Sequence, residues 1–384
     1  MPRNIQFKGE GAVTSTLRPD PFDTSEQAEQ ARHRAKLVET LASGEMLVFV
    51  GAGSSVIAGY PTGMGLLKHV EALAADKGIS PAPAVAGDFP HRMEALKVAL
   101  GSDLFYGAIQ QAMRPQELLG GEPRRGPTGF HKQLVSLPVR GFLTTNYDPV
   151  LQSALTRHYR DLSIEETVTP VCIHDGDMHE LGFAVRSIAT RRPPRHIIHL
   201  HGFLQSQKSI IAAASDYEEA YGFKLIGGTL ADVTITKPLC SVLRALFMTR
   251  SVLFVGFSLS ETSLNLVLSV LTDNQAGWGE GVHFAILPIP PSMPDAEKAR
   301  AREQLRQCGI AVIFFEIDES EDAANPFGRL EVLVSEISAE VSALRQSPVE
   351  RQPATAAAGV EPSGISWVQA LTNDNLARDN EDAD

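Results

Sequence analysis

The stretch MLVFVGAGSS, residues 46–55, decides the class of fold. Its first five residues are apolar without interruption and rich in β-branched and aromatic side chains, a pattern typical of a short strand covered on both faces. Such strands belong to parallel sheets, because the crossover helices of a parallel sheet cover both of its faces. The glycines that follow, Gly51 and Gly53, allow a tight turn at the end of the strand.

The same alternation of apolar strands and amphipathic helices recurs along the chain. Strands are predicted at MLVFV, GFLTTN, RHIIHLHGF, SVLFVGF, VHFAILP and AVIFFEI, and helices over 24–44, from 63, from 149, from about 260 and over 294–307. This alternation predicts an α/β fold with a mainly parallel sheet and helices on both faces.

The chain divides by composition into an arm, one large domain and a tail. Residues 1–23 read as an irregular N-terminal arm, and residues 24–345 carry the strand and helix pattern. Within them, helical periodicity over about 80–137 predicts an inserted, smaller helical lobe. Residues 346–384 are polar and acidic, which predicts disorder. In that tail Trp367 could serve as a docking anchor or could fold back on the parent domain.

Composition excludes several classes of protein. The chain has 384 residues, 43% of them hydrophobic, and a net charge of −12 without any lysine or arginine block, so a nucleic acid is not expected as a direct partner. Cys172, Cys240 and Cys308 lie far apart, which argues against a zinc ribbon and against a disulfide framework. Isolated thiols, no signal peptide and no long apolar run predict a soluble cytoplasmic protein without a metal and without a membrane anchor.

The carboxyl ends of parallel strands are where ligands bind in such sheets. The first strand delivers the run Gly51, Ala52, Gly53 and Ser54, whose backbone N–H groups could approach a diphosphate. The third glycine of the dinucleotide fingerprint is replaced by Val56, and no ribose-binding acid follows at the expected distance, so a hydride-transferring dehydrogenase is poorly supported. A tight turn without a ligand is the alternative for this motif.

The second strand ends in TTNYDP, residues 144–149. Asp148 before Pro149 is a good helix N-cap, which leaves Asn146 unexplained. A carboxamide both donates and accepts hydrogen bonds and carries no charge, so Asn146 suits a sugar hydroxyl or a positioned water molecule.

Two further strands deliver polar groups to the same edge. In HLHG, residues 199–202, alternation predicts that His199 and His201 share one face. His199 is interpreted as structural, and His201 is the candidate base because an imidazole accepts protons near neutral pH. After SVLFV, Gly256 permits close backbone approach and Ser258 offers a hydroxyl, which could instead cap the following helix.

Taken in order, VGAGSSVIAGYPT, TTNYD, HLHG and FVGFSLSE resemble the sirtuin-like (SIR2-like) superfamily, and within it the prokaryotic NAD-consuming effectors of antiphage defence. The resemblance covers about residues 40–290. It implies a Rossmann-like sheet with a helical lobe and NAD⁺ bound between them as a substrate. The implied roles are phosphate contact by the turn of Gly51, Ala52, Gly53 and Ser54, ribose contact by Asn146 and Asp148, base catalysis by His201, and adenosine contact by Gly256 and Ser258.

The departures from the deacylating sirtuins are as informative. At the position where the deacylating sirtuins are similar in having a glutamine, this chain has Thr145. Residues 62–64 read Thr-Gly-Met, where those enzymes have Asp-Phe-Arg, and the four-cysteine zinc module is missing. Each loss removes part of what seats an acyl-lysine peptide. We therefore expect an NAD⁺ glycohydrolase. The alternatives are ADP-ribosyl transfer to or deacylation of a protein, and a non-catalytic NAD or ADP-ribose sensor. By analogy with similar proteins we expect a homo-oligomer with a regulatory partner such as a HerA-type ATPase or an Argonaute-like protein.

Overall fold

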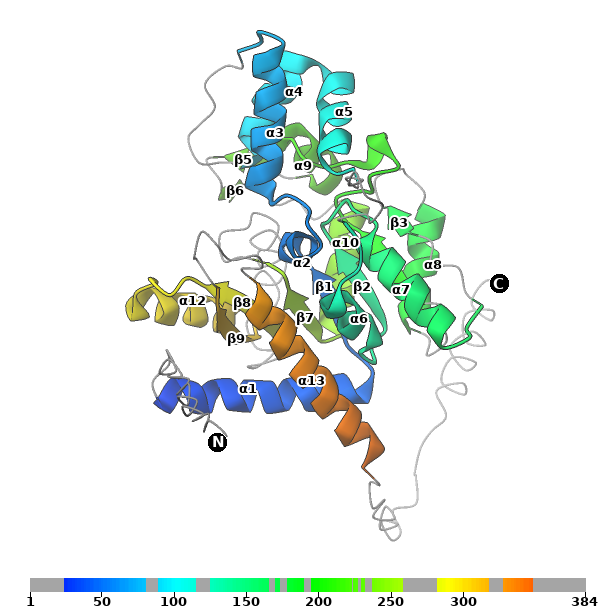
Figure 1. Cartoon of the computed structure of the whole chain (residues 1–384), viewed down its shortest axis with the longest axis vertical. Coiled ribbons are helices and arrows are strands. Elements are labelled where there is room, and N and C mark those ends of the chain that lie inside the picture. Colours follow the sequence, from blue (N-terminus) through cyan, green and yellow to red (C-terminus); the bar gives the residue numbers. More distant parts are fainter. Residues whose placement is uncertain are drawn as a thin grey trace, which may run out of the picture. The chain divides into compact units, whose positions relative to one another are not determined.

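A seven-stranded parallel sheet forms the framework of the fold (Figure 1). The strands follow the order β3-β4-β2-β1-β7-β8-β9, and every neighbouring pair is parallel. Their bounds are β1 Leu47–Val50, β2 Gly141–Thr144, β3 Pro170–Cys172, β4 His196–His199, β7 Val252–Val255, β8 His283–Ile289 and β9 Ile310–Glu316. The predicted α/β, Rossmann-like fold with a mainly parallel sheet is confirmed.

These elements belong to a computed structural model. It describes residues 24–80, 89–114, 125–165, 170–172, 178–189, 195–222, 224–226, 229–231, 237–257, 282–317 and 327–347. The N-terminal arm, Ser258, the helix predicted from about residue 260, and the tail with Trp367 lie outside these ranges.

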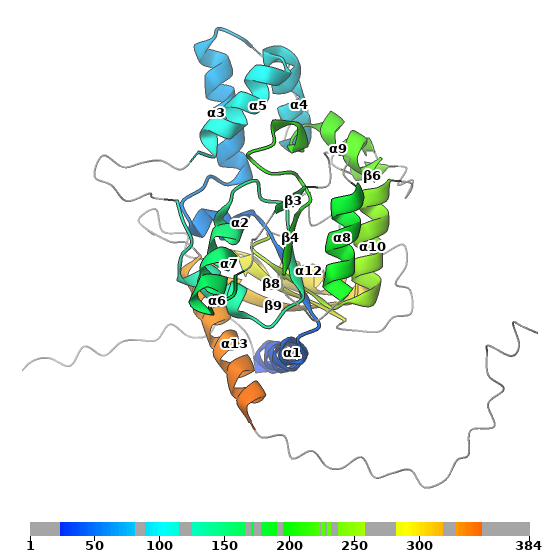
Figure 2. The same ribbon diagram turned by 90° about the vertical axis from the view of Figure 1, so that its right-hand side faces the viewer.

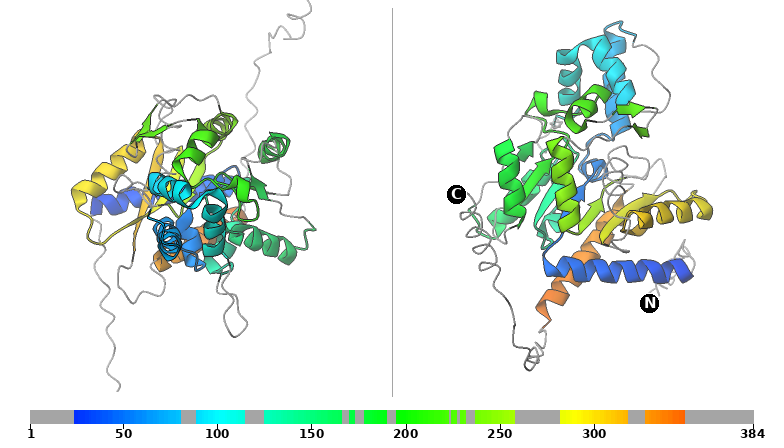
Figure 3. Two further views of the ribbon diagram at one scale, coloured as in Figure 1. Left: turned by 90° about the horizontal axis from the view of Figure 1, so that it is seen from above. Right: turned by 180° about the vertical axis from the view of Figure 1, so that it is seen from behind.

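Helices cover both faces of the sheet, as alternation along the strands requires (Figure 2). In β1, Leu47 and Phe49 join a core with four helices, and Val48 and Val50 join the opposite core with four others. The first core takes in α8 (Met178–Ala189), α9 (Ala214–Tyr221), α10 (Pro238–Thr249) and α12 (Asp295–Gln307). The second takes in α1 (Thr24–Ser43), α6 (Gly129–Ser136), α7 (Val150–Asp161) and α13 (Gly328–Gln346). The α12 helix lies beside β9 (Figure 3).

A third hydrophobic cluster forms the smaller helical lobe. It is built from α3 (Gly63–Asp76), α4 (Phe89–Leu100) and α5 (Ser102–Ala112), together with the buried side chains of Ile210, Ala212 and Ala213, which precede α9. The lobe packs on the turn after β2, because Tyr147 and Val150 belong to the same cluster. Its membership differs from the predicted range: α3 joins it, whereas α6 packs on the sheet through Phe130 and Leu134. The division into domains itself stays a prediction.

Several short elements were not predicted. They are α2 (Ala52–Ile57), β3, the 3-10 turn Gln207–Ser209 and the antiparallel pair β5 (Lys224–Ile226) and β6 (Thr229–Ala231). The helices α8, α9, α10 and α13 were also not predicted. Across the described ranges, no helix is both long enough and apolar enough to cross a bilayer.

Candidate functional site

The register of the sheet brings four strand ends to one level. Val50 of β1 pairs with Thr144 of β2 on one side and with Val255 of β7 on the other, and Thr144 pairs in turn with His199 of β4. The turns that follow these four residues therefore leave the sheet at the same edge. This edge is where the sequence analysis placed all of its candidate site residues.

The turns after β1 and β7 interlock through their glycines. The N–H of Gly53 donates to the carbonyl of Gly256 at 2.7 Å, and a Cβ on Gly51 would lie 2.6 Å from that same carbonyl oxygen. Gly256 has a φ of +78°, and a Cβ there would lie 2.9 Å from the backbone of Gly51 and of Ser54. These glycines are therefore required by backbone packing. Their predicted contacts with phosphate and adenosine, and that of Ala52, stay predictions.

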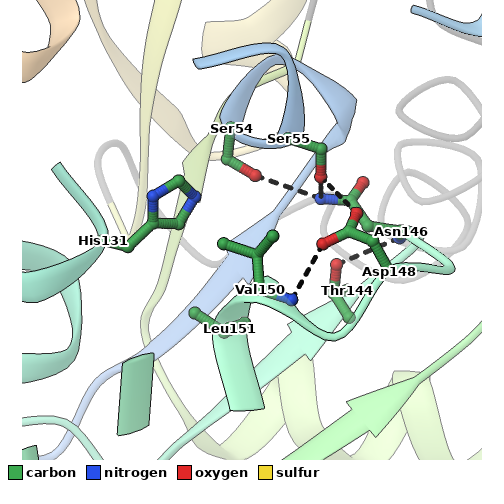
Figure 4. A pocket seen from close by; sticks show the side chains of 8 residues that line it. All are labelled: Ser54, Ser55, His131, Thr144, Asn146, Asp148, Val150 and Leu151. Atoms are coloured by element: carbon green, nitrogen blue, oxygen red, sulfur yellow. Dashed lines mark hydrogen bonds between the residues drawn. The ribbon is translucent and has the colours of Figure 1, made fainter. Parts of the chain in front are cut away.

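The carboxamide of Asn146 is held by the turn after β1 (Figure 4). Its Nδ2 lies 3.0 Å from the carbonyl oxygen of Gly51, 3.0 Å from the Oγ of Ser54 and 2.8 Å from the Oγ of Ser55. Its backbone N–H donates to the Thr144 hydroxyl at 3.0 Å. Its Oδ1 is buried and has no hydrogen-bond partner in the described part of the chain. The side chain is thus fixed at its donor end and unsatisfied at its acceptor end.

Asp148 is hydrogen-bonded to the segment that follows β1 and to the start of α7. Its carboxylate is buried, accepts from the Ser55 hydroxyl at 2.5 Å and accepts from the backbone N–H of Val150 at 3.0 Å. The second bond is the predicted cap of α7, although the helix begins one residue later than predicted, with Pro149 at its N-cap. Burial raises the pKa of Asp148, while hydrogen bonds from Ser55 and Val150 and the charge of Arg125 oppose that rise. The direct contact of Asp148 is thus a hydroxyl of the chain itself.

His199 has a structural role in this arrangement. Its Nδ1 lies 2.8 Å from the carbonyl oxygen of Asn146, and its Nε2 contacts Nε2 of Gln152 on α7. With Nδ1 as the donor to the carbonyl, Nε2 is the acceptor from the carboxamide of Gln152. The ring is buried, and burial lowers its pKa to about 4. His199 is therefore a neutral, hydrogen-bonded core histidine, in agreement with its interpretation from the sequence.

His201 faces a different environment from the one that alternation predicted. The strand β4 ends at His199, so the pattern of alternating faces stops before His201 and the two rings contact different helices. The ring of His201 packs edge-on against Tyr217 and Tyr221 of α9, with centroid separations of 5.1 and 5.9 Å. The prediction that His199 and His201 share one face is thus wrong, because the chain turns after His199.

The imidazole of His201 carries an unsatisfied nitrogen. Its Nε2 is buried and has no hydrogen-bond partner among the described residues, and burial lowers its pKa to about 3. A buried polar atom without a partner costs free energy unless another group reaches it. Asn146 and His201 thus each present one unsatisfied atom near the same sheet edge, and their joint role stays a prediction.

A small cavity opens beside Asn146 (Figure 4). Its lining residues are Ser54, Ser55, His131, Thr144, Asn146, Asp148, Val150 and Leu151. His201 does not line it, and the cavity as it stands has room for about one water molecule.

Ser55 and His131 of this site were missed in the sequence. Ser55 is visible in the GAGSS run, but its partner Asp148 is 93 positions away. His131 lies inside an ordinary amphipathic helix, where nothing local distinguishes it from a core residue. Within the described ranges no cluster of three or more histidine, cysteine, aspartate or glutamate side chains could hold a metal ion.

Comparison with known proteins agrees with the geometry. A family model described as a SIR2-like domain matches residues 140–313, a range that contains Asn146, His201 and Gly256. The chain is 26% identical over 144 residues to the NAD(+) hydrolase ThsA of Bacillus cereus (strain MSX-D12), which is 37% of this chain and 24% of that protein. It is 23% identical over 151 residues to the NAD(+) hydrolase ThsA of Enterococcus faecium, which is 38% of this chain and 26% of that protein.

The matched segment thus spans about a quarter of the length of these curated relatives. The range of the family model contains β2, β3, β4, β7 and β8 with the turns after β2, β4 and β7, whereas β1 and the turn of residues 51–54 precede it. Residues 140–313 thus match a SIR2-like domain, and part of the chain is similar to two NAD(+) hydrolases.

Proposed function

We propose that this chain is an NAD⁺ glycohydrolase, which cleaves the bond between nicotinamide and ribose to give nicotinamide and ADP-ribose. The observation that carries the proposal is the carboxamide of Asn146, whose donor end is fixed by the turn after β1 and whose buried Oδ1 lacks a partner in the described chain. Within a SIR2-like domain, and with two similar proteins named NAD(+) hydrolases, a ribose hydroxyl is the partner that fits this acceptor.

The residue types suit the chemistry of this bond. Nicotinamide leaves as a neutral molecule, so the acid of an ordinary glycosidase pair is not needed. What accelerates cleavage is a ribose held in a reactive orientation and a base that relieves charge at a hydroxyl or activates water. Asn146 supplies the first through a rigid hydrogen-bond acceptor.

His201 supplies the base in this proposal. Burial keeps its imidazole uncharged, which is the form that accepts a proton, but a pKa of about 3 makes a weak base. A hydroxyl that gives its proton to Nε2 leaves negative charge beside the new imidazolium, and an adjacent opposite charge raises the pKa of a histidine. The unsatisfied Nε2 is the atom at which this proton would be held.

Product analysis separates this proposal from its alternatives. Purified protein is incubated with NAD⁺ alone, and nicotinamide and free ADP-ribose are quantified. Equal amounts of both products without any acceptor protein support hydrolysis. Release that depends on an added acceptor supports transfer or deacylation, and binding of NAD⁺ without release supports a sensor.

We further propose that the protein acts in the cytoplasm as an NAD-depleting effector of antiphage defence, assembled as a homo-oligomer and held inactive by a partner. The support is the resemblance of its motifs to such effectors, and the partner class, a HerA-type ATPase or an Argonaute-like protein, rests on analogy. To test the role, cellular NAD⁺ is measured after phage infection with the wild-type protein and with Asn146→Ala.

To test whether the tail binds the partner, residues 347–384 are deleted and co-purification with the product of the neighbouring gene is measured. Unchanged association would contradict a role of the tail in binding the partner.

A further inference from the structure

A buried carboxylate away from the cavity joins the helical lobe to the segment that contacts His201. Asp216 lies on α9, which packs beside α4 of the lobe (Figure 1), and is 4% exposed. Its Oδ1 accepts from Nζ of Lys97 on α4 at 2.6 Å and from the hydroxyl of Tyr106 on α5 at 2.7 Å. Burying a carboxylate is costly unless a positive charge and hydrogen bonds compensate it. Here α4 supplies the charge and α5 supplies one of the hydrogen bonds.

The second oxygen of Asp216 fixes the chain that leads into α9. Oδ2 accepts from the backbone N–H groups of Ala212 and Ala213, at 3.0 and 2.8 Å. The preceding residue, Ile211, donates its N–H to the carbonyl of His201 at 2.9 Å. One carboxylate therefore binds the lobe through one oxygen and, through the other, the segment that is hydrogen-bonded to His201.

The ring of His201 packs against the helix that Asp216 anchors. Tyr217, the residue after Asp216, lies edge-on to this ring at a centroid separation of 5.1 Å, and Tyr221 lies edge-on to it at 5.9 Å. Nε2 of the imidazole has no hydrogen-bond partner among the described residues, so the contacts with the two tyrosine rings orient the imidazole at that end. A shift of α9 would move both tyrosine rings and change the direction in which Nε2 points.

We propose that Asp216 is a positioning residue, which anchors α9 to the helical lobe and thereby fixes, through Tyr217, the orientation of the imidazole of His201. The inference rests on the proposed function, in which His201 is the base, and adds a residue to it. Asp216 touches neither substrate nor reacting atoms in this assignment. Lys97 and Tyr106 hold its carboxylate, so the lobe contributes to the orientation of the base without contact with the bond that is cleaved.

The first test compares three variants of the full chain. Asp216→Asn removes the charge and one of the two acceptor oxygens, Tyr106→Phe removes a single hydroxyl from the carboxylate, and Glu219→Gln changes an exposed carboxylate on the same helix. In folded Asp216→Asn we expect kcat for nicotinamide release to fall about tenfold to a hundredfold, with little change in KM, because a small misplacement of a catalytic group is costly. Tyr106→Phe should lower kcat less, and Glu219→Gln should match the wild type. Unchanged kcat in folded Asp216→Asn would overturn the inference.

A double-mutant cycle separates positioning from a purely structural role. Tyr217→Leu removes the aromatic contact with His201 directly. If Asp216 acts through Tyr217, the loss of kcat in the double variant Asp216→Asn/Tyr217→Leu should be close to that of Tyr217→Leu alone. A loss equal to the product of the two single losses would show that the two residues act independently and would overturn the inference.

NMR of histidine-labelled protein provides a readout that does not need activity. The two tyrosine rings shift the ring signals of His201, so we expect these signals to move in Asp216→Asn and in Tyr106→Phe and to stay in place in Glu219→Gln. The ring of His199, which is hydrogen-bonded to α7 and to the turn after β2, is the internal reference and should keep its signals in all three variants. Signals of His201 that stay in place in folded Tyr106→Phe would overturn the positioning role even if Asp216→Asn fails to fold.

The spectra also keep this inference separate from the proposed function. Absence of NAD⁺ cleavage by the wild type would count against the proposed function, and the signals of His201 would then decide by themselves whether Asp216 orients the imidazole.

Discussion

The hydroxyl of Ser55 donates a 2.5 Å hydrogen bond to Oδ2 of Asp148, and both side chains are buried where the turns after β1 and β2 meet. The other carboxylate oxygen of Asp148 accepts from the N–H of Val150. One buried carboxylate thus connects α2 to the start of α7, and its partner Ser55 also contacts the carboxamide of Asn146. The cost of burying it should be visible in the pH dependence of stability.

Replacing Asp148 with asparagine should change that pH dependence. Because burial raises the folded-state pKa of Asp148, the folded protein binds this proton more tightly than the unfolded chain does. The contribution to stability is therefore present below the unfolded pKa and is lost as pH rises through the folded pKa. Asp148→Asn, which never ionises, should gain stability relative to the wild type as pH rises over that interval. Urea unfolding from acidic to neutral pH measures this, with the exposed Asp161→Asn as control, and a difference that does not vary with pH would contradict it.

Removing the carboxamide of Asn146 should abolish turnover at little cost to folding. Asn146→Ala removes contacts with Gly51, Ser54 and Ser55, but it also removes an unsatisfied buried oxygen, so we expect a loss of about 1 kcal/mol in the free energy of unfolding. Nicotinamide release should be undetectable while circular dichroism stays that of the wild type. An active, folded Asn146→Ala protein would remove Asn146 from the catalytic residues.

The two histidines of HLHG should respond in opposite ways to substitution. His199→Ala breaks two buried hydrogen bonds, to Asn146 and to Gln152, and should lower the free energy of unfolding by about 1–3 kcal/mol with a smaller effect on rate. His201→Ala should abolish turnover, because it removes the proposed base. The variant should still fold, because Nε2 of His201 bonds to no described residue. Thermal unfolding and nicotinamide release measured on both variants separate the roles. A folded but inactive His199→Ala beside an active His201→Ala would reverse the assignment.

The fold was predictable from the sequence because its signals are local. Continuous apolar runs such as residues 46–50 and 252–255 identify buried parallel strands without knowledge of their neighbours. The three-residue strand β3 was missed, because Pro170 at its start and its length leave too little periodicity to detect. The helix α2 was missed because the GAGSS run has the composition of a turn.

The site was predictable only in part, for a related reason. The sequence predicts which residues lie at the carboxyl edge of the sheet, because polar residues and glycines such as Asn146 and Gly256 follow directly after the apolar strands. The environment of His201 depends on where β4 ends and on Tyr217 of α9, which are tertiary facts. Ser55 acquires its hydrogen bond to Asp148, and His131 its place beside the cavity, only through tertiary packing.

The interlocked glycines predict a sharp contrast between two alanine substitutions. Gly256→Ala would put a Cβ 2.9 Å from two backbone atoms at a φ of +78°, which should cost at least about 1–2 kcal/mol from the backbone conformation alone. Gly107 lies in α5 with no atom within 4 Å of a Cβ, so Gly107→Ala should stabilise the protein by up to about 1 kcal/mol. Denaturant midpoints measure both. Equal midpoints for the two variants would show that the turns after β1 and β7 do not pack as described.

The most direct test of the central claim is a crystal structure of Asn146→Ala protein with NAD⁺ bound. The account predicts the dinucleotide at the carboxyl edge of the sheet, with the anomeric carbon of the nicotinamide ribose between position 146 and His201 and a ribose hydroxyl within about 3 Å of Nε2 of His201. NAD⁺ bound elsewhere on the protein, or bound with its nicotinamide ribose pointing away from both residues, would contradict it.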